Sequence, residues 1–185
     1  MQFDFSEGYP VLETERLIIK RITREHSEDL FVIRSDAESM AFVPRPLAKT
    51  IDDVNKWIDE CNKLIDSKDM VNFGFFLKET GKIIGIIGYV RMKKEHFRGE
   101  IGYICHSKHH RKGYTSEAFD AVVEFGFKVL KFHTIEAVID ATNEKSLGLI
   151  SKKNGFKLEA QFRDCFYYEG KFCSLNHFCK LNPYE

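Results

Sequence analysis

The sequence has no long apolar run, no excess of one charge and no cysteine pair at metal-ligand spacing. No stretch of its 185 residues approaches the ~18–20 apolar residues of a membrane-spanning helix, so no membrane association is expected. Lys and Arg total 28, as do Asp and Glu, which argues against binding nucleic acid through bulk charge. The five cysteines form no C-x-x-C pair, so we expect no metal site and reduced thiols.

We expect no secretory signal, internal repeat or linker in this sequence. Its first ten residues carry acids and no apolar run, so we expect a loosely tied arm and a cytoplasmic location. With 43% apolar and 14% aromatic residues, the chain can build a packed core, which argues against disorder. A single domain spanning residues 1–185 is therefore predicted.

Hydrophobic periodicity predicts strands that alternate with helices. Strands are predicted over residues 12–22, 71–78, 83–92, 99–105, 134–141, 157–166 and 172–181. Helices are predicted after Thr23, from Thr50, over residues 113–130 with a core stripe ending at Val129, and from Thr142. The two prolines at 44 and 46 predict a loop between the first two helices. This order is typical of an α/β (α+β) domain with a mixed sheet.

Residues 100–118, EIGYICHSKHHRKGYTSEA, pass from a strand through a basic loop into a helix. Six of the seven residues from Ser107 to Gly113 are Lys, His, Arg or Gly. A helix N-terminus presents unpaired N–H groups and a partial positive charge, so the pattern predicts a site for a phosphate-bearing ligand. Gly113 would let the backbone approach that phosphate closely. A solvated basic loop without a ligand is the alternative.

This run resembles the acyl-CoA pyrophosphate loop of the GNAT superfamily of N-acetyltransferases. The family pattern Gln/Arg-x-x-Gly-x-Gly/Ala falls on residues 110–115, with His110 and Thr115 as departures from it. A second hallmark, Asn with Ser three residues later and a closing Gly-Phe, falls on Asn143, Ser146 and residues 155–156. The opening LETERLIIKRI and the later GKIIG further resemble the RimJ/RimL branch, which acetylates protein N-terminal amines.

The resemblance, which covers residues 12–181, implies the GNAT acyl-CoA N-acyltransferase fold. That fold has a mixed, mostly antiparallel central sheet flanked by helices, and its cofactor is acetyl-CoA. By the same resemblance the pantetheine arm would bond the backbone of Ile104, Cys105 and His106. The phosphates would be held by His110, Arg111, Lys112, Gly113, Tyr114, Thr115 and Ser116, and the arm also by Asn143 and Ser146. Asn143 as a mere helix cap, and Cys105 as a small buried hydrophobe rather than a nucleophile, are the structural alternatives.

The implied reaction is direct attack of an amine on the acetyl thioester in a ternary complex. Glu100 is the predicted base, although an exposed strand-end acid or a substrate-binding anion is an equal alternative. Ser146 is the first candidate for the proton donor, with Tyr103 or a water behind it. A backbone N–H of Cys105 or Ile104 would stabilise the oxyanion.

The acceptor is expected to be a primary amine, foremost a peptide or protein N-terminus. Its pocket would be lined by the second helix, the Phe42–Pro46 loop and the tail hairpin with Tyr167 and Tyr168. The RimJ/RimL branch has an Asp after the hairpin's Gly-Lys-aromatic, where this chain has Cys173 and Ser174, which suggests a different acceptor. The alternatives are a small amine (polyamine, aminoglycoside or amino acid) and a catalytically weak CoA-binding domain. Either a monomer or a homodimer is compatible with the sequence.

Overall fold

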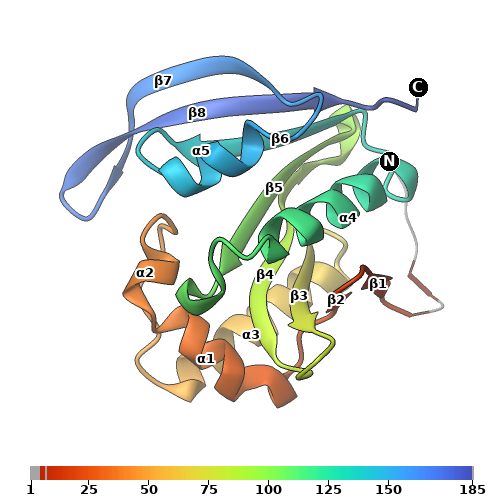
Figure 1. Cartoon of the computed structure of the whole chain (residues 1–185), viewed down its shortest axis with the longest axis vertical. Helices are drawn as coiled ribbons and strands as arrows, with labels where there is room; N and C mark the ends of the chain where they lie inside the picture. The colour runs from red at the N-terminus through yellow and green to blue at the C-terminus, as the bar shows by residue number, and fades with distance from the viewer. Residues whose placement is uncertain (1–4, 7, 185) are drawn as a thin grey trace.

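The computed structural model describes residues 5, 6 and 8–184 and is built around one eight-stranded sheet (Figure 1). The strands are β1 (Leu12–Glu13), β2 (Leu17–Lys20), β3 (Val71–Leu77), β4 (Ile83–Lys93), β5 (Arg98–Cys105), β6 (Thr134–Asp140), β7 (Lys157–Tyr168) and β8 (Lys171–Leu181). They lie in the order β1-β2-β3-β4-β5-β6-β8-β7, and only β5 and β6 pair in parallel. The predicted mixed, mostly antiparallel sheet is therefore confirmed.

Helices cover both faces of the sheet. They are α1 (Ser27–Arg34), α2 (Ala37–Met40), α3 (Ile51–Asp66), α4 (Tyr114–Lys128) and α5 (Glu144–Ile150). Helix α4 packs on one face, where Tyr89 is fully buried and its hydroxyl donates to the Val122 carbonyl at 2.9 Å. Helices α1 and α3 cover the other face through Leu30, Ile33 and Ile58. Burying apolar side chains on both faces supplies most of the folding free energy.

The first predicted strand is two strands. Residues 12–22 do not run straight, because Leu12 pairs with Ile19 across an antiparallel hairpin. Its turn is closed by Thr14, whose N–H donates to the Leu17 carbonyl at 3.0 Å and whose hydroxyl accepts from Leu17 N–H at 3.1 Å. The prediction of one continuous strand is wrong, because this local turn competes with extension.

Helix α2 was not predicted, because four residues cannot show a helical apolar period. It is instead specified by its cap: the Asp36 carboxylate accepts from the N–H groups of Glu38 at 3.4 Å and Ser39 at 3.2 Å.

The last residue of the core stripe predicted for the long helix, Val129, does not belong to the core. Helix α4 ends at Lys128, and Val129 beyond it is 50% exposed.

The described part of the amino-terminal arm is tied down, contrary to the prediction of a loose arm. The Tyr9 hydroxyl donates to the Asn72 carbonyl at 3.0 Å, and its ring lies 5.2 Å from that of Phe73. The Phe5 ring lies 6.3 Å from that of Phe125. Residues 1–4 and 7 of the predicted arm lie outside the described residues.

The sheet opens between β5 and β6. The two strands pair only over three positions, the last of which joins Glu100 to Glu136. Beyond that position β5 continues alongside β4 and β6 continues alongside β8. The two strands therefore diverge into a V-shaped opening, with α4 following one arm and α5 the other (Figure 1). Divergence at the carboxyl ends of adjacent parallel strands is a usual place for a ligand.

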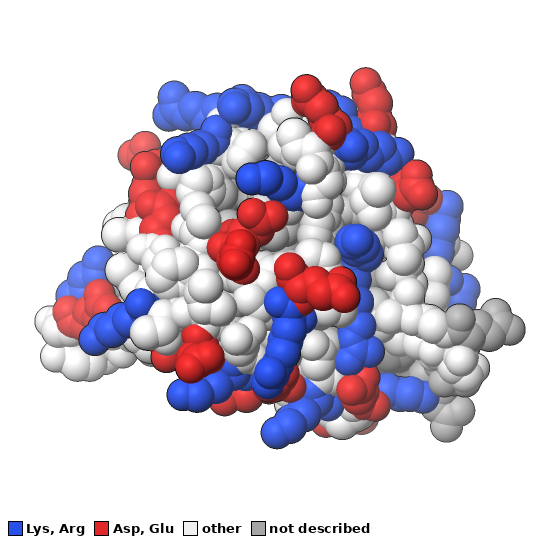
Figure 2. Space-filling model, turned by 90° about the horizontal axis from the view of Figure 1, so that it is seen from below, with Lys and Arg blue, Asp and Glu red and all other residues white. Residues whose placement is uncertain are grey.

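Two surface properties bear on partners. Acidic and basic side chains are interspersed over the face seen in Figure 2, in keeping with the equal numbers of each in the sequence. None of the helices in the described part of the chain is long and apolar enough to cross a membrane.

Candidate active site

The register of β5 decides which backbone groups line the opening. His106 N–H donates to the Ile84 carbonyl at 2.9 Å, and Ile104 lies opposite Ile86. Bonded pairs alternate in an antiparallel ladder, so the amide groups of Ile104 also point toward β4, whereas those of Tyr103 and Cys105 point into the opening. The predicted pantetheine contacts through the backbone of Ile104 and His106 are therefore corrected: β4 already uses the Ile104 groups and the His106 N–H, and the His106 carbonyl accepts from His109 N–H at 2.8 Å.

The Cys105 backbone faces the opening, and the surroundings of its side chain favour the structural alternative of a small buried hydrophobe. The residue is buried, and burial raises the pKa of its thiol, which the Thr115 hydroxyl offsets only in part. A protonated, buried thiol packs as a small hydrophobe. The Cys105 carbonyl accepts from His110 Nε2 at 2.8 Å, while its N–H points into the opening.

The loop after β5 has the backbone shape of an anion site. Arg111 and Gly113 take positive φ angles of 59° and 83°, and α4 starts at the next residue. The N–H groups of the first helical turn, at Tyr114, Thr115 and Ser116, have no partner within the helix. A Cβ added at Gly113 would meet only Arg16 Nη2, at 3.2 Å, so the space beside the loop is open to a ligand.

The loop also carries a positive field. Lys108, Arg111 and Lys112 are exposed. Burial, and after it the charge of Lys112, lowers the pKa of His109. Exposed cations around unpaired N–H groups fit the polyphosphate of an acyl-CoA.

The side chains of two residues predicted to bind the cofactor contact other residues. The Ser116 hydroxyl accepts from Lys153 Nζ at 2.6 Å, and the Arg16 guanidinium lies 4.5 Å from the centre of the Tyr114 ring. Ser116 accepts from Lys153 and keeps its hydroxyl proton free to donate, and Ser116 and Tyr114 both begin the helix with unpaired N–H groups.

Arg16 is a site residue that the sequence did not assign. Its Nη1 donates to the Lys112 carbonyl at 3.0 Å, and its Nε to Glu117 Oε2 at 2.7 Å. The Thr14 hydroxyl also donates to Glu117, at 2.5 Å. The β1–β2 turn thus clamps the N-terminus of α4 and the loop before it. Arg16 lies in the LETERL motif, but the motif does not indicate that its side chain contacts Lys112 and Glu117.

The α5 arm contributes Asn143 and Ser146. Asn143 Oδ1 accepts from Ser146 N–H at 3.1 Å, so the alternative of a helix cap is confirmed for that oxygen, and its amide nitrogen is the group left for a ligand. The Tyr103 hydroxyl is buried and has no hydrogen-bond partner among the described residues. Burial raises the pKa of Tyr103, and the neighbouring Ser146 hydroxyl offsets part of that rise. The two predicted proton donors therefore lie side by side.

Glu100 lies at the point where the strands part. Arg91 Nη1 is 2.8 Å from each Glu100 carboxylate oxygen; the Glu100 side chain is 16% exposed and that of Arg91 74%. Glu136 lies opposite Glu100 in the parallel register and therefore on the same face, where it is paired with Arg98. This second pair could not be predicted, because Glu136 is 36 residues from Glu100 in the sequence and meets it only through the strand register.

The acceptor side is bounded by the α2–α3 loop and the β7–β8 hairpin. The tip of the hairpin extends on the same side of the molecule as α2 (Figure 1). Burial and Glu169 raise the pKa of Tyr168, and Arg45 of the α2–α3 loop counteracts them, so these two segments approach each other. The aromatic side chains near the tip are open to solvent: Tyr167 is 61% exposed and Phe172 66%.

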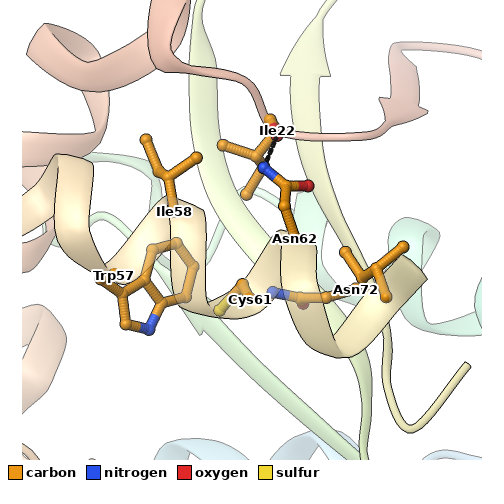
Figure 3. A pocket seen from close by; sticks show the side chains of 7 residues that line it. Ile22, Trp57, Ile58, Cys61, Asn62 and Asn72 are labelled. Atoms are coloured by element: carbon orange, nitrogen blue, oxygen red, sulfur yellow. Dashed lines mark hydrogen bonds between the residues drawn. The ribbon is translucent and has the colours of Figure 1, made fainter. Parts of the chain in front are cut away.

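A small hollow under α3 is not part of this site (Figure 3). It is lined by Ile22, Trp57, Ile58, Cys61, Asn62, Ile65 and Asn72. The Asn62 amide donates to the Ile22 carbonyl at 3.2 Å, and burial raises the pKa of the Cys61 thiol to about 11. The hollow holds no charged side chain and lies between α3 and β3, away from the opening, so it serves packing.

Comparison with known proteins identifies the family. Residues 16–157 match the acetyltransferase (GNAT) domain. The chain is 32% identical over 177 residues to N-acetyltransferase YoaA of Bacillus subtilis (strain 168), covering 96% of this chain and 99% of that protein. It is 26% identical over 105 residues to spermidine N(1)-acetyltransferase of Escherichia coli (strain K12), covering 57% and 56% of the two chains. The chain therefore belongs to the GNAT acetyltransferases and is an acetyl-CoA-dependent N-acetyltransferase.

Solved structures share the fold over nearly the whole chain. A GNAT-family acetyltransferase from Bacillus anthracis superposes with a TM-score of 0.82 at 27% identity, covering 94% of this chain and 99% of that one. Ribosomal-protein-S5-alanine acetyltransferase from Vibrio fischeri gives 0.78 at 21% identity, covering 94% and 97%. The microcin C7 self-immunity acetyltransferase MccE, solved with acetyl-CoA and AMP, gives 0.82 at 17% identity, covering 91% and 93%.

Proposed function

We propose that the enzyme acetylates the N-terminal amine of a peptide or protein, as the RimJ/RimL branch does. The observation that carries the proposal is the open acceptor side: the β7–β8 hairpin bears the exposed aromatic residues Tyr167 and Phe172, and its tip extends on the same side of the molecule as α2 (Figure 1). A peptide can lie along such a surface, whereas a small polyamine is better held in a closed acidic pocket. The similarity to a ribosomal-protein acetyltransferase in fold is consistent with this acceptor.

The residues around the opening fit acetyl-CoA, which when bound supplies an activated acetyl thioester. In the proposal, the N–H groups of Tyr114, Thr115 and Ser116 hold its phosphates, together with His110, Arg111 and Lys112. The Asn143 amide orients the pantetheine arm. The Cys105 N–H, which points into the opening, donates to the thioester oxygen as negative charge develops there.

Proton transfers complete the proposed mechanism. Glu100 accepts a proton from the acceptor ammonium, directly or through a water, which leaves a neutral amine able to attack. Arg91 must move aside for this, and its 74% exposure makes that inexpensive. The Ser146 hydroxyl then donates a proton to the departing thiolate and regains one from the attacking nitrogen, which loses its second proton as the amide forms. Tyr103, whose hydroxyl has no other partner in the described part of the chain, is the adjacent second donor.

Turnover of acetyl-CoA with a panel of peptides and small amines tests the proposal. We expect peptides with a free N-terminus to be acetylated and the same peptides with a blocked N-terminus to be inert. Glu100→Gln should lower kcat by about 100-fold and remove the acidic limb of the pH–rate profile. An unchanged profile would remove Glu100 from the base role without affecting the acceptor assignment.

A small amine is the second candidate, supported by the relative that acetylates spermidine. It predicts a kcat/KM for spermidine at least ten times that for any peptide, measured in the same assay, where about 1.4 kcal/mol separates each factor of ten. Acetylation of spermidine alone would overturn the peptide proposal.

A further inference from the structure

Three charged or polar side chains from separate segments meet at the open end of the V. Lys145 of α5 places Nζ 2.7 Å from Glu38 Oε1 of α2 and 3.2 Å from His110 Nδ1 of the loop. His110 Nδ1 lies 3.7 Å from the same Glu38 oxygen. Lys145 and Glu38 are 107 residues apart in sequence. Neither residue is among those that define the motifs that predicted the site.

The contacts of His110 fix its tautomer. A carbonyl oxygen only accepts hydrogen bonds, so the proton shared with the Cys105 carbonyl at 2.8 Å belongs to His110 Nε2. An ammonium only donates, so His110 Nδ1 accepts from Lys145. The ring therefore donates through Nε2 to the Cys105 carbonyl and accepts through Nδ1 from Lys145, which holds the Lys145 cation beside the loop at the position where the GNAT pattern has Gln or Arg.

These contacts bridge the two arms of the opening. His110 follows β5 and Lys145 follows β6, and the two strands separate beyond Glu100 and Glu136. Helix α2 is fixed against the same loop, because the Ser39 hydroxyl accepts from Ser107 N–H at 2.8 Å. This contact fixes α2, and with it Glu38, next to Lys145.

The ion pair between Lys145 and Glu38 is weak enough for Lys145 to change partners. The side chains of Lys145 and Glu38 are 50% and 61% exposed, and exposed pairs of this kind are weak. A carboxylate and a phosphate compete for the same ammonium, and a phosphate with its greater charge is the stronger partner. The position of Lys145 beside the phosphate loop provides that second partner.

We propose that Lys145 is a ligand of a phosphate group of coenzyme A, and that Glu38 is the internal anion from which it is released when the cofactor binds. The proposal rests on the placement of the cofactor phosphates at residues 110–116. It explains how a chain with His110 in place of Gln or Arg keeps a side-chain cation at this position.

Calorimetric titration of CoA, 3′-dephospho-CoA and pantetheine into the intact protein tests the proposal without requiring catalysis. We expect Lys145→Met to weaken CoA binding about tenfold, the usual cost of losing one charge-assisted hydrogen bond to phosphate, and to leave pantetheine binding unchanged. If 3′-dephospho-CoA is weakened equally, Lys145 binds the pyrophosphate. If only CoA is weakened, it binds the 3′-phosphate. Both results support the proposal.

Glu38→Gln is the converse test, because it removes the competing anion. It should tighten CoA binding about two- to threefold in the wild-type background, as expected for a surface pair, and do nothing in the Lys145→Met background. A Glu38→Gln effect of equal size in both backgrounds would overturn the exchange.

A second ion pair in the same chain provides the control. Lys128 and Glu124 of α4 are 52% and 56% exposed and 2.5 Å apart, and they lie at the far end of the helix from the loop. Lys128→Met and Glu124→Gln should leave CoA binding unchanged. Unaltered CoA binding in Lys145→Met, with binding lost in Gly113→Asp, would overturn the role of Lys145 and leave the loop intact. If neither change weakens binding, the placement of the phosphates itself is wrong.

Discussion

The β5–α4 loop and the β7–β8 hairpin are built in opposite ways. The loop is held at several points by other segments: Arg16 donates to the Lys112 carbonyl, Ser107 N–H to Ser39, and His110 to the Cys105 carbonyl. The hairpin is a long ribbon at the sheet edge whose β7 residues are almost all exposed. Its register breaks between Leu158 and Ala160 and again between Phe162 and Phe166.

This contrast matches what the proposed function requires of each region. A fixed loop offers its N–H groups without an entropic cost at the moment of binding, which suits a donor that is the same in every reaction cycle. A ribbon with bulges and exposed aromatic residues can adapt its surface to a longer, variable partner. In the proposed function the same sheet thus joins a pre-organised donor side to an adaptable acceptor side, and each can be perturbed separately.

Gly113→Asp should produce the largest effect, because it disrupts the fixed side. A carboxylate beside the phosphates repels them, and we expect acetyl-CoA binding to weaken by about 100-fold or more, measured by calorimetry. Circular dichroism should show the fold retained, because a Cβ at this position meets only the end of the Arg16 side chain.

Gly113→Asn is the matched control for that variant. Gly113 has a φ of +83°, a conformation that Asn and Asp tolerate about equally well. Asn therefore reproduces the shape and backbone strain of Asp without its charge, and it should lose far less affinity. Equal losses in the two variants would mean that the conformation of the loop, and not phosphate repulsion, is responsible.

Changes in the hairpin should affect the KM for the amine acceptor and not the affinity for acetyl-CoA. Replacing the exposed aromatics Tyr167 and Phe172 by Ser should raise the KM for the amine acceptor about tenfold, as for the loss of two contact residues in an interface. Acetyl-CoA affinity should not change. The measurement is steady-state kinetics with each substrate varied in turn, and a rise in the KM for acetyl-CoA would contradict the separation of the two sides.

Local signals in the sequence predicted the backbone features of the candidate site that the structure shows. The basic loop, Gly113 and the Asn143 cap lie within a few residues of the backbone they shape, so their composition and spacing reveal them. Most strands and helices were found for the same reason. The predicted secondary structure was wrong in two places. The Thr14 turn interrupts a run of residues with strand character, and α2 is too short to show a helical apolar period.

Long-range contacts could not be predicted in the same way. Glu117 meets Arg16 from 101 residues away, and Glu136 joins Glu100 only through the register of a parallel pair. The direction of the β5 amide groups depends on which residues bond to β4, so the backbone roles of Ile104 and His106 were assigned wrongly. The family resemblance predicts the ligand of the loop, but the contacts that hold the loop are visible only in the folded chain.

Arg16→Met tests whether holding the loop matters for binding. Removing the guanidinium frees the Lys112 carbonyl and one Glu117 oxygen, so the loop should sample more conformations, and we expect CoA affinity to fall about fivefold. Binding enthalpy and entropy from calorimetry should show a larger entropic cost. Arg24→Met, which breaks an exposed pair with Asp59 on α3, is the control and should leave CoA affinity unchanged.

Asp36→Ala should give the smallest effect, a small loss of stability. It tests the cap of α2, the helix that carries Glu38. Desolvation pushes the pKa of Asp36 up, but hydrogen bonds from Ser39, Ser107 and the N–H groups of α2 outweigh it and hold the pKa at about 2. We expect the loss of this cap to lower the free energy of unfolding by about 1 kcal/mol at pH 7.

The pH dependence of that difference distinguishes the charge from the cap. A carboxyl whose pKa is lowered on folding stabilises the folded state fully above its unfolded value of about 3.9, and the contribution is lost as the pH falls toward the folded value. The stability gap between wild type and Asp36→Ala should therefore be constant above pH 4 and shrink toward pH 2 in urea titrations. Asp36→Asn keeps a capping oxygen without a charge, so its gap to Asp36→Ala should not vary over that range. If the wild-type gap also stays constant, α2 is held by capping geometry alone, and the ionised carboxylate contributes nothing to the fixed side of the molecule.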